Sequence, residues 1–83
     1  MEPGYHIAEI QKGILGDSSK IAEELQELQD AEAQHCKIMM LVELSDLIGA
    51  VELYLNKNFP DISLQDLLTM SAITQRAFNN GRR

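Results

Sequence analysis

The chain has 83 residues with one cysteine, and its 13 acidic and 7 basic residues give a net charge of −6. This negative charge opposes broad contact with a phosphate backbone, so we expect no nucleic-acid partner. No segment reaches the roughly 18 apolar residues of a membrane span, and a lone cysteine forms no intramolecular disulfide. We therefore expect one domain over residues 1–83, in a cytoplasmic protein without a membrane partner.

The composition is typical of helices. Leu, Ile, Ala, Glu and Gln are abundant, and no segment alternates β-branched and polar residues, which predicts an all-α fold. Residues 5–12 carry apolar side chains at helical spacing and predict a short N-terminal helix. Two glycines follow, and Asp17, Ser18 or Ser19 then offers an N-cap for the first of three main helices. The fold class predicted is a small helical bundle.

The long proline-free stretch over residues 20–58 divides into two parts by apolar pattern. Its first part carries a narrow apolar stripe, whereas residues 38–55 are apolar on nearly every face. A rod of this length builds no core, so we predict a turn between two antiparallel helices at residues 34–37. The all-round apolar surface exceeds what three short neighbours cover. We therefore expect a homodimer or a homotetramer.

The last helix has clear boundary signals. Pro60 prevents the preceding helix from continuing, because proline lacks the N–H that a helix interior requires. Ser63 is positioned to cap a final helix that has Asp66 in its first turn and Gly81 at its C-terminal end.

Acidic residues recur three positions apart in both helices of the predicted hairpin. Glu24 and Glu27 share one face of the first helix, and Glu43 and Asp46 share one face of the second. The midpoint between residues 27 and 43 is His35, and so is the midpoint between residues 24 and 46. A turn centred there places four carboxylates at one level, where they repel unless a cation lies between them. Oxygen ligands at this density suit Mg²⁺ or Mn²⁺.

The acids also carry a resemblance to a known family. They form the pattern EExxE followed by ExxD, which consists here of Glu23, Glu24, Glu27, Glu43 and Asp46. Over about residues 18–83 the chain resembles the all-α nucleoside triphosphate pyrophosphohydrolases of the MazG-like type. The resemblance implies an enzyme in which Mg²⁺ is held between two helices and a metal-activated water cleaves a nucleoside triphosphate to a monophosphate and pyrophosphate. It implies the metal ligands Glu24, Glu27, Glu43 and Asp46.

The resemblance also implies that Glu23 is a supporting or additional ligand. Glu23 or Glu24 is the candidate base for the attacking water. The candidates for binding the triphosphate are Lys20, Lys57, Arg76 and Arg82. Each has an ordinary interpretation as well: Lys20 pairs with an acid one helical turn away, and the others are cations favoured near a helix C-terminus. His6 has no partner at ligand spacing in the sequence.

Two other classes of function fit the same residues. The scaffold fits a non-enzymatic helical oligomer that binds a partner protein or sequesters a nucleotide. It also fits a purely structural bundle whose acids form a solvated face. The enzyme predicts metal-dependent turnover, and the binding module predicts none. The structural bundle predicts that neutralising Glu43 or Asp46 stabilises the fold without any other loss.

Overall fold

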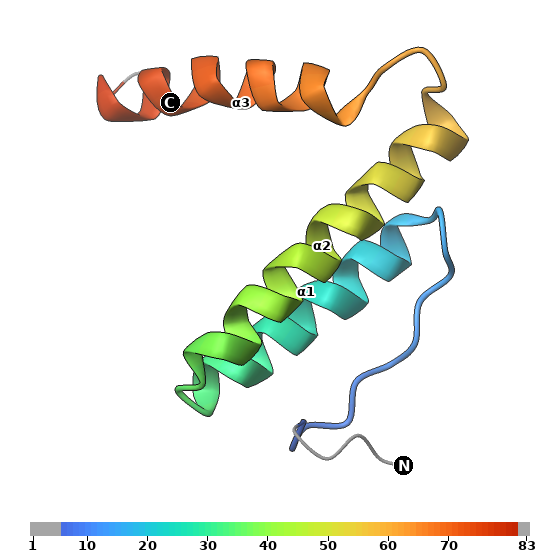
Figure 1. Cartoon of the computed structure of the whole chain (residues 1–83), viewed down its shortest axis with the longest axis vertical. Coiled ribbons are helices and arrows are strands. Elements are labelled where there is room, and N and C mark those ends of the chain that lie inside the picture. The colour runs from blue at the N-terminus through green and yellow to red at the C-terminus, as the bar shows by residue number, and fades with distance from the viewer. Residues whose placement is uncertain (1–5, 82–83) are drawn as a thin grey trace.

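The computed structural model describes residues 6–81, which form three helices: α1 (Ser18–Ala33), α2 (Lys37–Asn58) and α3 (Leu64–Asn79) (Figure 1). The described range contains no strand, which confirms the all-α prediction. No helix within it combines the length and the apolar character needed to cross a bilayer.

Helices α1 and α2 lie side by side as an antiparallel hairpin (Figure 1). The turn between Ala33 and Lys37 falls where the sequence predicted it. His35 has φ of 57°, in the left-handed region that ends many helices. The backbone N–H of Cys36 returns to the carbonyl of Ala31 at 3.2 Å, which closes the end of α1. This turn sets which residues of the two helices face each other.

Reciprocal hydrogen bonds begin α3 as predicted. Ser63 Oγ accepts the N–H of Asp66 at 3.1 Å, and the Asp66 carboxylate accepts the N–H of Ser63 at 2.9 Å. This capping box satisfies two backbone donors that the first helical turn leaves without carbonyl partners. At the other end Gly81 has φ of 72° and donates to the Phe78 carbonyl at 3.0 Å.

Helix α3 contacts α2 but not α1 within the described residues, and it projects away from the hairpin (Figure 1). The radius of gyration is 14.7 Å, whereas a compact domain of this length has about 12 Å. The accessible surface is 6204 Å², compared with about 5,000 Å² for a compact monomer of this mass. The single chain is therefore an open arrangement of helices with much of its surface uncovered.

The expected helix over residues 5–12 is wrong for its described part, residues 6–12, which are not helical. The backbone of residues 6–12 instead donates hydrogen bonds to a side chain of α1. The N–H groups of Ile7 and Ala8 donate to the carboxylate of Asp30 at 3.0 and 3.3 Å. These tertiary bonds replace the local carbonyl partners that a helix would supply, so the segment runs along the hairpin as irregular chain (Figure 1).

The buried residues of the described chain are unusual in kind. The buried apolar residues are Ala31, Ala50 and Leu55, whereas the buried acidic residues are Glu23, Glu24, Asp30 and Glu43. Large apolar side chains on α2 and α3 are meanwhile exposed, among them Ile38, Leu41, Ile48, Leu68, Ile73 and Phe78. Buried carboxylates cost free energy unless they are paired or bind cations. The interface between α1 and α2, which buries these carboxylates, is therefore the candidate functional site.

Candidate metal centre

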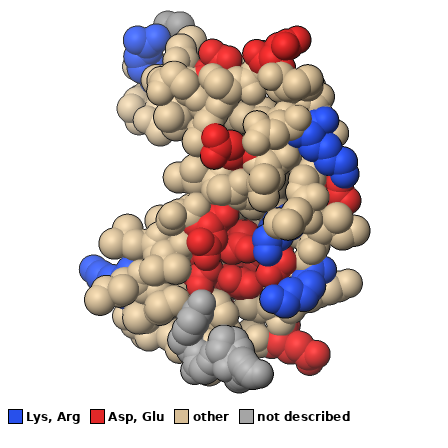
Figure 2. All heavy atoms as spheres, turned by 45° about the vertical axis from the view of Figure 1, so that its right-hand side comes forward, with Lys and Arg blue, Asp and Glu red and all other residues tan. Residues whose placement is uncertain are grey.

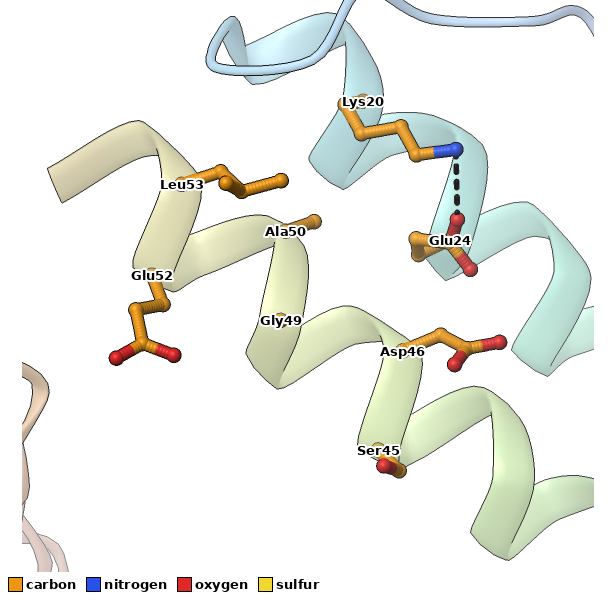
Figure 3. Close-up of a pocket in the computed structure, with 8 residues that line it drawn as sticks. All are labelled: Lys20, Glu24, Ser45, Asp46, Gly49, Ala50, Glu52 and Leu53. Carbon is orange, nitrogen blue, oxygen red and sulfur yellow. Dashed lines mark ion pairs between the residues drawn. The ribbon is translucent and has the colours of Figure 1, made fainter. Parts of the chain in front are cut away.

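Four carboxylates meet between the two helices of the hairpin. Glu24 and Glu27 from α1, and Glu43 and Asp46 from α2, each place one oxygen within 4.8 Å of the others. Figure 3 shows Glu24 and Asp46 pointing toward each other from neighbouring helices. The structure thus brings together all four predicted metal ligands, because the turn at His35 sets the register that the spacing implied.

Two of these carboxylates, Glu43 and Glu24, each have a buried oxygen that lacks a hydrogen-bond partner among residues 6–81. Glu43 is 0% exposed, and its Oε1 has no hydrogen-bond partner among residues 6–81. Glu24 Oε1 is likewise buried without a hydrogen-bond partner among those residues. Native proteins rarely leave such groups unsatisfied. Oxygen atoms in this state fit a hard dication such as Mg²⁺, which prefers carboxylate ligands.

The charge state of the cluster reflects its crowding. Burial, the proximity of Glu43 and the charge of Glu24 together raise the pKa of Glu27 to about 7. In the metal-free protein, Glu27 therefore holds a proton over part of the neutral pH range. A cation between these carboxylates would favour their ionised forms.

One residue of the cluster was missed by the sequence analysis. His6 Nε2 lies 3.1 Å from Glu43 Oε2 and 3.6 Å from Glu27 Oε1, while its Nδ1 lies 2.8 Å from Asp30 Oδ2. Burial would lower the pKa of His6, but Asp30 and Glu43 outweigh it and raise that pKa. No sequence spacing links His6 to α1. The one available signal was Asp30, which lies one helical turn beyond Glu27 on the same face.

Glu23 and Lys20 form the other edge of the cluster. Glu23 Oε1 accepts the N–H of Gly13 at 2.8 Å and lies 3.1 Å from Lys20 Nζ, which is also 3.1 Å from Glu24 Oε2. Burial would raise the pKa of Glu23, but the Gly13 N–H and Lys20 lower it. Glu23 is not among the four clustered ligands, and it ties the N-terminal segment to α1.

Two of the other predicted phosphate-binding residues, Lys57 and Arg76, do not reach the acids within the described part of one chain. Lys57 Nζ pairs with Asp17 Oδ1 at 2.6 Å, and Arg76 is on α3, which makes no contact with α1. Arg82 lies outside the described residues. Lys20 is thus the predicted phosphate-binding residue that the described structure places beside the carboxylates.

An open pocket of about 540 Å³ adjoins the cluster (Figure 3). It is lined by Lys20, Glu24, Ser45, Asp46, Gly49, Ala50, Glu52 and Leu53. Lys20, Glu24 and Asp46 lie at one end, whereas the other end carries the small or apolar residues Gly49, Ala50 and Leu53 with Glu52 beside them. A Cβ added at Gly49 would meet no atom within 4 Å, so the pocket has free space at this position. In Figure 2, the largest group of red acidic side chains forms a central patch with blue basic side chains beside it, and smaller red groups lie elsewhere on this face.

Comparison of the chain with protein-family models, curated proteins and solved structures finds no significant match. The geometry of the four carboxylates and the acidic pattern that produces it are therefore the features of this chain that indicate a function.

Proposed function

We propose that this protein is a Mg²⁺-dependent, cytoplasmic nucleoside triphosphate pyrophosphohydrolase, acting on ribo- or deoxyribonucleotides in a MazG-like manner. The observation that carries the proposal is the meeting of four carboxylate oxygens within 4.8 Å, around a Glu43 that is 0% exposed. The proposed ligands are Glu24, Glu27, Glu43 and Asp46, with Mn²⁺ as a substitute ion. When bound, the ion would neutralise phosphate charge and lower the pKa of the attacking water.

The pocket suggests how the substrate lies. Its charged end, with Lys20 beside Glu24, would receive the triphosphate, and Lys20 would bind phosphate oxygens in place of a carboxylate. Its apolar end at Gly49, Ala50 and Leu53 would receive the nucleoside. The substrate would therefore lie with its triphosphate at the Lys20 end of the pocket and its nucleoside at the Gly49 end.

The reaction is hydrolysis of a phosphoanhydride. Water adds to the α-phosphorus while the bond from that phosphorus to the bridging oxygen of the β-phosphate breaks, giving a monophosphate and pyrophosphate. Lys20 contacts both candidate bases, but Glu24 lines the pocket and its Oε1 has no hydrogen-bond partner among residues 6–81, whereas Glu23 accepts the N–H of Gly13. We therefore favour Glu24 as the group that accepts the proton of the water.

We also propose that the active form is a homodimer or homotetramer. Leu41 on α2 and Ile73 on α3 are 68% and 55% exposed, so the part of the chain that the structure describes leaves them largely uncovered. A second copy packed on these helices would bury apolar surface and could bring the partner's Arg76 toward the acids. Such an arrangement would add an arginine to Lys20 as a second phosphate-binding residue at the site.

The proposal is tested by incubating the full chain with a panel of ribo- and deoxyribonucleoside triphosphates and Mg²⁺ or Mn²⁺. Release of pyrophosphate and monophosphate in equal amounts is expected from the wild type. Glu43→Gln keeps the shape of the side chain and removes its charge, so activity should fall at least about a hundredfold. The matched control Glu32→Gln changes an exposed acid of α1 and should retain activity.

The exposed apolar helices favour a second candidate, a non-enzymatic oligomer that binds a partner protein or a nucleotide. It predicts no pyrophosphate release with any substrate, even at high protein concentration, while helicity and oligomeric state remain intact. That result would overturn the enzymatic proposal.

A further inference from the structure

The N-terminal segment brings an imidazole to the carboxylates. His6 and Asp30 belong to different segments, and Asp30 Oδ2 accepts a hydrogen bond from His6 Nδ1 at 2.8 Å. A carboxylate only accepts hydrogen bonds, so Nδ1 carries the proton of this bond. The ring therefore directs its other nitrogen, Nε2, at Glu43 and Glu27, 3.1 and 3.6 Å away.

The orientation of His6 is supported at several points. Asp30 is buried, and it also accepts the backbone N–H groups of Ile7 and Ala8 at 3.0 and 3.3 Å. One carboxylate thus fixes both the ring and the backbone that carries it. Histidines that bind metals usually donate their second ring nitrogen to a carboxylate in this way, which sets the tautomer and the direction of the ligand atom.

We propose that His6, Glu27 and Glu43 form a second cation site, which shares Glu27 and Glu43 with the first and takes a first-row transition-metal dication. One ligand atom from each residue lies within 4.8 Å of the other two. Independently of the clustering, Glu43 is completely buried and its Oε1 has no hydrogen-bond partner among residues 6–81, whereas its Oε2 lies 3.1 Å from His6 Nε2. Two features therefore prepare this position for a cation. Asp30 orients the His6 ring, and Glu43 Oε1 is buried without a hydrogen-bond partner among residues 6–81.

The donor set determines the kind of ion. Mg²⁺ strongly prefers oxygen ligands, whereas an imidazole nitrogen with two carboxylates suits Mn²⁺, Fe²⁺, Co²⁺ or Zn²⁺. The first site, made of four carboxylates, includes Asp46 and not His6. The two sites therefore differ in chemistry while sharing a pair of bridging carboxylates. The inference depends on the proposed function only through these shared ligands, and not on the reaction.

Metal counting on the full chain tests the second site. We would remove metals with a chelator, titrate with Mn²⁺ and measure the free ion by electron paramagnetic resonance. The wild type should bind two Mn²⁺ per chain, and pulsed spectra should show coupling to an imidazole nitrogen. His6→Asn keeps a donor for Asp30 but removes Nε2, so it should bind one Mn²⁺ and lose the nitrogen coupling. Asp46→Asn should instead lose the first site and keep the coupling.

His35→Asn is the matched control, because it removes the other histidine at a turn position with φ of 57°, which asparagine tolerates. It should bind two ions. The proposal is overturned if the wild type binds one ion without nitrogen coupling, or if His6→Asn still binds two. Two ions with coupling but no pyrophosphate release would support this site and reject the pyrophosphohydrolase. One bound ion together with Mg²⁺-dependent hydrolysis would support the pyrophosphohydrolase and reject the second cation site.

Discussion

Asp30 on α1 holds the ring of His6, with 2.8 Å between Asp30 Oδ2 and His6 Nδ1, although 24 residues separate them along the chain. The same carboxylate accepts the N–H groups of Ile7 and Ala8. Burial would raise the pKa of Asp30, but these contacts lower it. Asp30 therefore attaches residues 6–8 to α1, while Glu23 holds the same segment further along the chain at Gly13.

Neutralising Asp30 should release that segment. Asp30→Asn loses the charge-assisted hydrogen bonds, so hydrogen exchange at the Ile7 and Ala8 amides should accelerate by about tenfold or more. Exchange measured by NMR checks this, with exposed Asp61→Asn in the α2–α3 loop as control. Unchanged protection in Asp30→Asn would mean that other contacts hold the segment.

Binding of Mg²⁺ should stabilise the fold, because the metal-free protein buries carboxylates that lack partners. At about 100 times its Kd, a ligand adds about 2.7 kcal/mol to the free energy of unfolding, or roughly 10–20 °C in Tm for a domain of this size. Calorimetry with Mg²⁺ and with a chelator measures the shift. Equal Tm values under both conditions would contradict a metal centre.

Asp46→Asn separates the metal centre from a structural bundle. Removing one of several crowded negative charges should raise the metal-free stability by about 0.5 kcal/mol. The metal-centre proposal adds that Mg²⁺ affinity falls sharply, whereas the structural bundle predicts no change beyond the gain in stability. Thermal unfolding of this variant measures its stability, and isothermal titration calorimetry measures its Mg²⁺ affinity. Retained Mg²⁺ affinity would exclude Asp46 as a ligand.

Metal affinity should depend on pH near neutrality. The pKa of Glu27 in the metal-free protein is raised to about 7, and a carboxylate must lose its proton to bind a metal. Binding below pH 7 therefore releases a proton, so the apparent affinity at pH 6 should be about tenfold weaker than at pH 8. Titration calorimetry in buffers of different ionisation enthalpy counts the released proton. The same affinity at both pH values would argue against Glu27 as a ligand.

Gly49 should control how much room the nucleoside has. A Cβ at this position meets no atom within 4 Å, and replacing a helical glycine by alanine stabilises by up to about 1 kcal/mol. Gly49→Ala should therefore fold at least as well as the wild type. Gly49→Leu should fill the apolar end of the pocket and raise KM about tenfold or more, while Mg²⁺ affinity stays unchanged. An unaltered KM in Gly49→Leu would place the nucleoside elsewhere.

The exposed apolar helices should drive self-association. Ile73 on α3 is 55% exposed, and a charge introduced there would oppose burial against a second copy. Analytical ultracentrifugation should show a dimer or tetramer for the wild type and a shift toward monomer for Ile73→Glu. Gln75→Glu adds the same charge at another exposed position of α3 and should leave the assembly intact. A monomeric wild type would refute the oligomer.

The sequence by itself determined the helices and the register of the hairpin. Apolar periodicity, the Pro60 break and the Ser63 cap act over a few residues, so they can be read locally. The acids at 24, 27, 43 and 46 meet because helical spacing and one turn fix their relative positions, and the symmetry about His35 made this visible.

Only the tertiary structure decided the surroundings of that cluster. The local pattern of residues 5–12 favoured a helix, but hydrogen bonds from Ile7 and Ala8 to Asp30 override it. They bring His6 to Glu43, and a salt bridge likewise takes Lys57 to Asp17. These contacts join segments that are far apart in sequence. Their energies depend on the path of the whole chain, which no local pattern of residues encodes.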